Sequence, residues 1–324
     1  MKAIRVEKFG SNRVLKINTL PIPKPDRHQV LVKTYGIGIN PVETYIRSGN
    51  YARLPNLPYT PGSDAVGKVH AVGDQVENFK IGDTILVGHP AADLNPGAYS
   101  EYFTLSEKFG VRVPESDNIT DLAAFAVPYF TAYRALEKGG LTTKTKRLLV
   151  HGASGGVGMV CVQLAKILNP NIKITATCSS NEAENILKDL GADKCLNHRE
   201  NGYLNDEEPF DLIIEMLANV NLDRDMKKIG RNGKIVIVGN RGEIQVCPRD
   251  IMATEASVIG CVLWNMSVEE MTEAGKKLSI WLEQKKLKPI IDRHFGFTDA
   301  GFQDAHEFVI SSEKLSKGKV IIKL

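Results

Sequence analysis

The sequence has no long hydrophobic run. No apolar stretch among its 324 residues approaches the roughly 18–20 residues needed to span a bilayer. The start, Met1–Arg5, lacks the apolar core of a signal peptide. We therefore expect a cytoplasmic protein without a membrane partner. The net charge is only +3, so the sequence has no basic excess of the kind that binds nucleic acid.

Motifs for metal and disulfide chemistry are also missing. The five cysteines form no C-x-x-C pair, and the seven histidines form no H-E-x-x-H motif. Cys161, Cys195 and Cys261 stand among apolar neighbours, where cysteine usually packs as a small hydrophobic side chain. We expect reduced thiols and no catalytic metal.

Two patterns divide the chain. In its first third, short β-like runs such as 29–35, 65–72 and 84–87 are separated by Gly, Pro and Asp, which is typical of a small, mostly antiparallel barrel. Beyond Asp121, continuous apolar strands such as 210–215 alternate with helical segments such as 121–127 and 222–229, which favours a doubly wound parallel sheet. We expect the last strand, at 318–324, to return to the first domain.

The clearest motif is a glycine-rich turn between an apolar strand and a helical pattern. Residues 148–158 read Leu-Leu-Val-His-Gly-Ala-Ser-Gly-Gly-Val-Gly. Gly155 permits a tight turn and a close approach of backbone to phosphate, and Gly158 lets the helix pack on its strand. The first glycine of the usual fingerprint is replaced by Ala153. Such a turn predicts a pyrophosphate at the N-terminus of the helix.

The end of the next strand indicates which nucleotide binds. In this fold an acidic residue there hydrogen-bonds the adenosine ribose and repels a 2′-phosphate. Residues 177–180 read Thr-Cys-Ser-Ser, and no carboxylate follows until Glu182. This favours NADPH over NADH. In the alternative interpretation, Ser179 and Ser180 only cap the next helix, and the two roles are compatible.

Several blocks of the sequence resemble the zeta-crystallin family, the NADPH:quinone oxidoreductases of the zinc-free branch of the medium-chain dehydrogenase/reductase superfamily. The resemblance extends from the first strand to the last. It is carried by the glycine-rich turn and by the segments 40–49, 57–64, 127–136, 197–200, 213–221 and 238–242.

This resemblance implies an α/β fold with a GroES-like barrel as catalytic domain and a Rossmann domain. The expected segments are 1–124 for the catalytic domain, 125–263 for the NADPH-binding domain and 264–324 for the return, with the cofactor in an interdomain cleft. The residues that match cofactor-binding positions are Tyr45, Ser154, Gly155, Gly156, Val157, Ser179, His198, Asn221, Val238, Gly239, Asn240, Arg241, Cys261, Val262 and Leu263.

The resemblance also implies chemistry without a metal. Zinc-dependent relatives place a cysteine near Asn40 and a Gly-His-Glu where this chain has Gly62-Ser63-Asp64. Without a Lewis acid, the acceptor must already be electrophilic, as ortho- and other quinones are. Asn40 and Tyr45 are the candidates to hydrogen-bond the acceptor carbonyl or orient the nicotinamide. Alternatively, Asn40 is a turn residue and Tyr45 packs on a helix face.

The same sequence features are compatible with other functions. A related zinc-free reductase of alkenals or enones would share every cofactor residue. The resemblance further implies a homotetramer or homodimer, and an additional role in binding AU-rich RNA.

Overall fold

The computed structural model describes residues 1–89, 94, 96–311 and 315–324. The chain forms two compact units. Unit 1 comprises Met1–Phe130, Met266–Lys314 and Gly318–Leu324, and unit 2 comprises Thr131–Asn265 and Leu315–Lys317. The unit boundaries fall a few residues after the expected positions 124 and 263. No helix among the described residues is long and apolar enough to cross a bilayer.

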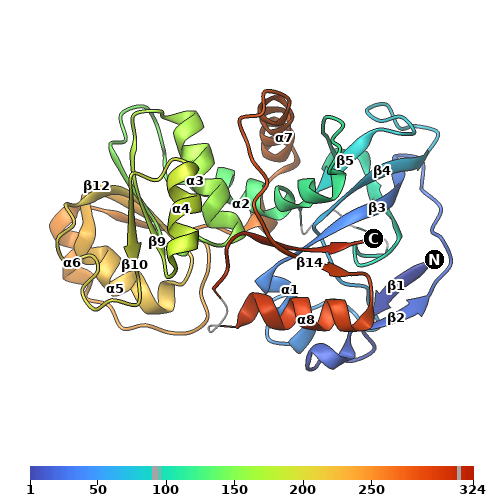
Figure 1. Ribbon diagram of the computed structural model, residues 1–324, viewed down its shortest axis with the longest axis horizontal. Helices are drawn as coiled ribbons and strands as arrows, with labels where there is room; N and C mark the ends of the chain where they lie inside the picture. Colours follow the sequence, from blue (N-terminus) through green and yellow to red (C-terminus); the bar gives the residue numbers. More distant parts are fainter. Residues whose placement is uncertain (90–93, 95, 312–314) are drawn as a thin grey trace. The chain divides into compact units, whose positions relative to one another are not determined.

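Unit 1 is built on a seven-stranded sheet in the order β14-β15-β3-β4-β5-β7, with β6 paired to β3 (Figure 1). A separate pair, β1 and β2, is antiparallel. The C-terminal strand β15 lies antiparallel to β3, so the end of the chain belongs to the sheet of unit 1. The strands are β1 (Lys2–Arg5), β2 (Lys16–Thr19), β3 (Gln29–Ile39), β4 (Ala65–Val72), β5 (Thr84–Val87), β6 (Tyr102–Ser106), β7 (Val111–Arg112), β14 (Ile291–Gly296) and β15 (Lys319–Lys323).

The helices of unit 1 have identifiable start and stop signals. Helix α1 begins with Pro41, and its N-cap Asn40 forms a capping box with Glu43. It ends at Gly49, whose φ of 81° is the left-handed conformation of a C-cap. The helices are α1 (Pro41–Ser48), α7 (Val268–Glu283) and α8 (Asp299–Ile310), with short 3₁₀ turns at Asn12–Val14, Glu107–Phe109 and Ile119–Ala124.

Two apolar clusters stabilise unit 1. In one, Phe302 of α8 packs against Tyr99, with ring centroids 4.7 Å apart, beside strands β3 and β15. The other lies among β3, β4, β5 and β6 and includes Phe103 and Leu105. Polar side chains buried beside the first cluster therefore lie in surroundings of low dielectric constant.

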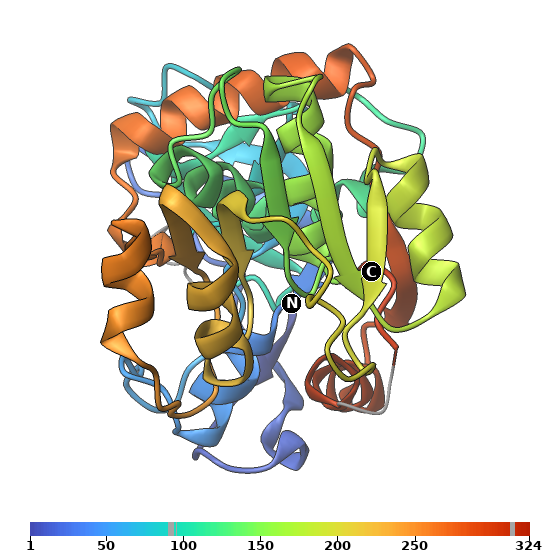
Figure 2. The same cartoon turned by 90° about the vertical axis from the view of Figure 1, so that its left-hand side faces the viewer.

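Unit 2 is a six-stranded sheet in the order β10-β9-β8-β11-β12-β13, and all of its strand pairs are parallel. In Figure 2 these strands run side by side, coloured from green to orange. Their bounds are β8 (Arg147–Val150), β9 (Lys173–Cys178), β10 (Lys194–Asn197), β11 (Phe210–Glu215), β12 (Ile229–Ile237) and β13 (Ser257–Gly260).

The strand order of unit 2 is that of a doubly wound sheet. The chain runs outward from β8 to β10 and then, in the opposite direction, from β11 to β13. Because parallel crossovers are right-handed, the two halves place their helices on opposite faces of the sheet. The first half contains helices α3 (Gly156–Leu168) and α4 (Asn181–Asp189). The second half contains α5 (Ala218–Lys228) and α6 (Pro248–Thr254). Helix α2 (Ala126–Lys138) contains the boundary between the units, and a 3₁₀ turn at Leu263–Asn265 ends unit 2.

The sequence predictions agree with most of this architecture. Strands β4, β5 and β11 have the predicted bounds. The helix expected at 121–127 is instead a 3₁₀ turn followed by α2. The helix expected at 222–229 begins earlier, at Ala218, because it starts directly after the loop that follows β11.

Candidate functional site

The cofactor residues expected in unit 2 gather at one edge of the parallel sheet. Since all six strands point the same way, their carboxyl ends meet there. Each expected residue follows the end of a strand or lies in the helix after it: Ser154–Val157 after β8, Ser179 after β9, His198 after β10, Asn221 in α5 after β11, Val238–Arg241 after β12 and Cys261–Leu263 after β13.

The glycine-rich turn follows β8, at the point where the strand order reverses. Strands β8 and β11 are parallel neighbours. From β8 the chain continues toward one side of the sheet, and from β11 it continues toward the other. Open α/β sheets bind ligands at such a switch point. Helix α3 has Gly155 as its N-cap and no side-chain cap. A Cβ atom at Gly158 would lie 2.5 Å from Ala153 Cα, so glycine is required for this close packing. The turn fits a pyrophosphate on the helix N-terminus.

The end of β9 carries hydroxyl groups rather than a carboxylate. Ser180 caps α4, and its hydroxyl accepts a hydrogen bond from Ala183 N at 3.2 Å. Ser179 precedes it and is half-buried. His198 follows β10, and loss of solvent contact on part of its imidazole lowers the pKa below 6.5. These residues present neutral hydrogen-bond donors at this end of the edge.

The segments after β11 and β12 are bonded to each other. Backbone Val238 N donates to Glu215 O at 2.8 Å, and Ala218 N donates to Gly239 O at 3.0 Å. A Cβ atom at Gly239 would lie 2.2 Å from Met216 O, so the two segments touch through their backbones. Farther along, Arg241 N donates to the side chain of Asn219 at 2.9 Å. The expected residues Val238–Arg241 and Asn221 are thus held in one connected layer.

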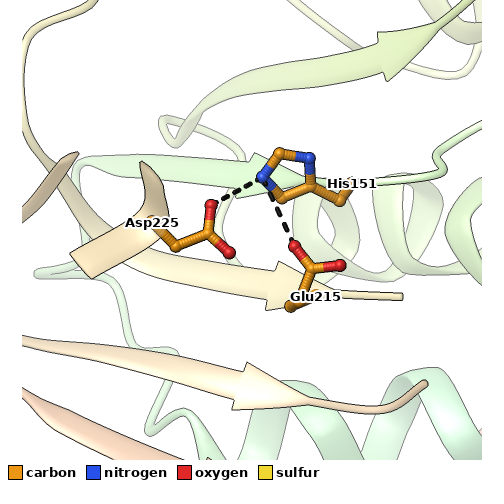
Figure 3. A group of neighbouring side chains, drawn as sticks. All are labelled: His151, Glu215 and Asp225. Atoms are coloured by element: carbon orange, nitrogen blue, oxygen red, sulfur yellow. Dashed lines mark hydrogen bonds and ion pairs between the residues drawn. The ribbon is translucent and has the colours of Figure 1, made fainter. Parts of the chain in front are cut away.

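A buried group that the sequence analysis missed lies beneath this layer. His151 follows β8, Glu215 ends β11 and Asp225 lies in α5. Figure 3 shows the imidazole facing both carboxylates. Its Nε2 lies 2.8 Å from Asp225 Oδ1 and 3.6 Å from Glu215 Oε2. We call these three residues the His–Glu–Asp cluster.

The His–Glu–Asp cluster holds expected cofactor residues in place. Glu215 Oε1 accepts hydrogen bonds from Leu217 N and from Asn221 Nδ2, the latter at 3.2 Å. His151 directly precedes the glycine-rich turn. The cluster therefore connects that turn with the start of α5.

Burial controls the protonation of this cluster. Desolvation raises the pKa of Glu215 and of Asp225 to about 7 and lowers the pKa of His151. Within the described part of the chain it is the one group of three such residues whose ligand atoms, within 4.8 Å of one another, suit a metal ion. An ion would have to displace the direct hydrogen bond between His151 and Asp225.

In unit 1 a buried polar network surrounds Asn40. Glu43 Oε2 accepts from Asn40 N and from the Tyr99 hydroxyl, both at 2.8 Å, and Tyr99 in turn contacts His306 Nε2 at 2.9 Å. Desolvation raises the pKa of Glu43 to about 7 and lowers that of His306 to about 3. The Asn40 side chain itself is bonded to Asp64 and to Lys319.

Tyr45 lies on α1, one helical turn after Pro41. Its side chain is half-buried, and no described residue hydrogen-bonds its hydroxyl. The hydroxyl can therefore donate to a ligand, as the sequence analysis expects.

Comparisons with known proteins cover the whole chain. Residues 26–115 match the alcohol dehydrogenase GroES-like domain, and residues 156–279 match the zinc-binding dehydrogenase family. The chain is 40% identical to human quinone oxidoreductase over 331 residues, which covers 100% of this chain and 98% of the human protein.

Two further matches are a reductase named for another substrate and a solved structure with a bound nucleotide. The chain is 30% identical to 2-methylene-furan-3-one reductase of Solanum lycopersicum, covering 99% of this chain and 79% of the tomato protein. Among solved structures, a mycobacterial protein complexed with NADPH superposes with a TM-score of 0.86 at 24% identity, covering 100% of both chains.

Proposed function

The chain is an oxidoreductase that belongs to the quinone oxidoreductase family of the medium-chain dehydrogenase/reductase superfamily, and we propose that it oxidises NADPH and reduces ortho- and other quinones without a metal. The observation that carries this proposal is the match to human quinone oxidoreductase along the full chain. It is supported by the cofactor residues expected in unit 2, which gather at the carboxyl edge of the unit 2 sheet.

Three features favour NADPH as the cofactor. The turn at residues 152–158 fits a pyrophosphate, and no carboxylate follows β9 until Glu182. Ser179 and His198 offer neutral hydrogen-bond donors instead of a charge that would repel a 2′-phosphate. The mycobacterial structure with the same fold was solved with NADPH.

When bound, the reduced nicotinamide supplies the reducing equivalents. Two-electron reduction of a quinone to a hydroquinone consumes one NADPH and one proton. The protein's part is to hold the acceptor and exclude competing reactions. We assign the hydrogen bonds to the acceptor carbonyl to the amide of Asn40 and the hydroxyl of Tyr45.

The residues around Asn40 do not fit a catalytic zinc ion. Zinc sites in enzymes are built from thiolates, imidazoles and carboxylates. Here Asn40 and Asp64 are bonded to the ammonium group of Lys319, and Ser63 stands beside Asp64. A second cation at this place would meet the ammonium group at close range.

A second candidate function is the reduction of conjugated enones. The tomato relative is named for a substrate in which a carbon–carbon double bond is conjugated to a ketone. Quinones are conjugated ketones as well, and the same carbonyl-binding groups would bind both kinds of substrate.

A homo-oligomer is also proposed, with the molar mass in solution as its test. An additional role in binding AU-rich RNA, suggested by the resemblance, is tested by an RNA gel shift competed with NADPH.

The deciding experiment follows NADPH oxidation against 9,10-phenanthrenequinone, 1,2-naphthoquinone and a 2-alkenal, with NADH and a chelator as controls. We expect quinone turnover that prefers NADPH and does not change with the chelator. Turnover of the alkenal alone would establish the enone function instead. Loss of quinone turnover with the chelator would disprove the metal-free mechanism.

A further inference from the structure

The side chain of Asn40 lies between two oppositely charged residues. Lys319 Nζ donates to Asn40 Oδ1, and Asn40 Nδ2 donates to Asp64 Oδ2 at 2.9 Å. Lys319 Nζ also donates to the same Asp64 oxygen at 2.9 Å. All three side chains are buried, with residue exposures of 6% for Asn40, 0% for Asp64 and 3% for Lys319.

These contacts leave the Asn40 amide only one orientation. An ammonium group can only donate hydrogen bonds, and an ionised carboxylate can only accept them. A flipped amide would place its NH₂ group against Lys319 and its oxygen against Asp64, which makes both contacts repulsive. The chemistry of the neighbours therefore fixes the amide nitrogen on the side of Asp64.

The backbone leaves room for this arrangement. Lys319 starts β15 and Asn40 follows β3, whose Ile39 is paired with Val320. On the same strand, a Cβ atom at Gly38 would lie 2.5 Å from Asp64 Oδ2 and 2.7 Å from Lys319 Cε. A larger residue at this position would push the ion pair away from the amide.

Stability alone is a weak reason for such an ion pair. Desolvation of two buried charges costs about as much as their attraction returns, and apolar replacements are often neutral or stabilising. What this pair does for Asn40 is specific: it orients the amide and polarises its N–H bonds. One of the two amide hydrogens is bonded to Asp64, and the second is left as a donor.

We propose that Lys319 is a positioning residue, which acts through Asn40 by holding the second N–H of the Asn40 amide toward the carbonyl oxygen of the acceptor. This inference rests on the proposed function for its role in turnover. The orientation of the amide does not depend on that function and can be measured by itself.

A double-mutant cycle tests the role in turnover. The pair Lys319→Met and Asp64→Asn, made together, removes both charges and so avoids an unpaired buried carboxylate. We expect this pair and Asn40→Ala each to lower kcat/KM for the quinone about tenfold to a hundredfold. Because Lys319 acts through Asn40, the triple variant should be no slower than Asn40→Ala. Losses that multiply in the triple variant would overturn the proposal.

Controls separate positioning from folding. Lys323→Met removes a lysine at the exposed end of the same strand and should leave kcat/KM unchanged. Lys319→Gln retains a donor for Asn40 Oδ1 and should recover part of the lost rate. The NADPH dissociation constant and the melting temperature are measured for every variant. If the rate falls only in proportion to the folded fraction, the role is structural and the proposal fails.

The side-chain amide of Asn40 provides a readout without turnover. In ¹⁵N spectra its NH₂ pair is assigned as the pair that Asn40→Ala removes. We expect two well-separated, slowly exchanging hydrogens in the wild type, and faster exchange after Lys319→Met with Asp64→Asn. An unchanged pair would overturn the positioning role. An inactive wild type with the expected spectra would disprove the proposed function alone.

Discussion

The imidazole Nε2 of His151 lies 2.8 Å from Oδ1 of Asp225, and solvent reaches almost none of either side chain. The two residues belong to the loop after β8 and to α5, so their hydrogen bond joins the two halves of the doubly wound sheet at the switch point. Glu215 extends the same contact to Asn221. The His–Glu–Asp cluster and Asn221 are thus joined in one hydrogen-bonded network.

Breaking this contact should cost stability. Asp225→Ala leaves His151 and Glu215 buried without their partner, and we expect the free energy of unfolding to fall by about 3 kcal/mol. Asp223→Ala, on the same helix, removes only an exposed ion pair with Lys227 and should leave the free energy of unfolding almost unchanged. Urea denaturation of both variants measures the difference. Equal losses would show that the buried contact contributes nothing specific.

The pH dependence of stability should follow the buried acids. Burial raises the pKa of Glu43 to about 7 from 4.5, so the folded chain binds this proton more tightly than the unfolded chain. Its stabilising contribution is complete below pH 4.5 and is lost as the pH rises toward 7. Each such group changes the free energy of unfolding by about 1.4 kcal/mol per pH unit within that window.

The variant Glu43→Gln isolates this group. Between pH 5 and 7 we expect the unfolding free energy of the variant to fall less steeply than that of the wild type. Glu215 and Asp225 keep titrating in the variant, so some slope remains. Parallel curves for the two proteins would contradict the raised pKa of Glu43.

A methyl group at the glycine-rich turn should impair cofactor binding. In Gly158→Ala the new Cβ would lie 2.5 Å from Ala153 Cα and 2.6 Å from Gly152 O. Backbone atoms must move, at a cost of about 1–3 kcal/mol, and the NADPH dissociation constant should rise by about tenfold or more. Gly296→Ala, in β14 of unit 1, is the matched control, because a Cβ there meets no atom within 4 Å. A normal dissociation constant in Gly158→Ala would mean that the turn does not hold the cofactor.

A carboxylate after β9 should reverse the cofactor preference. We expect Ser179→Asp to raise the NADPH dissociation constant about tenfold or more, with a much smaller effect on NADH. Ser180→Ala removes the N-cap of α4 and should lower stability by about 1 kcal/mol without a change of preference. Isothermal titration with both nucleotides distinguishes the two. An unchanged NADPH-to-NADH ratio in Ser179→Asp would place the 2′-phosphate elsewhere.

Much of the fold could be predicted from local patterns. The strands of unit 2 are continuous apolar runs, since both faces of a parallel sheet are covered, and the glycine-rich turn marks the switch point between β8 and β11. The expected cofactor residues then fall at one edge because parallel strands end together. Local signals alone did not indicate α8, although Thr298 caps its start.

The buried polar groups could not be predicted in this way. His151 and Asp225 are 74 positions apart, and Asn40 and Lys319 are 279 positions apart. No motif spans either pair, and each residue type is common on protein surfaces. Only the register of β15 on β3, and of β8 beside β11, brings these side chains together.

The contact between Asn40 and Lys319 also has a consequence for biosynthesis. Asn40 and Asp64 emerge from the ribosome early, whereas Lys319 follows the synthesis of all of β8 to β13. A barrel that folded before then would contain the Asp64 carboxylate without its counter-ion, and its strand β3 would lack the neighbour β15. Unit 2, with its short-range βαβ connections, can complete its sheet first. The last strand would then close the barrel and orient the amide in one late step.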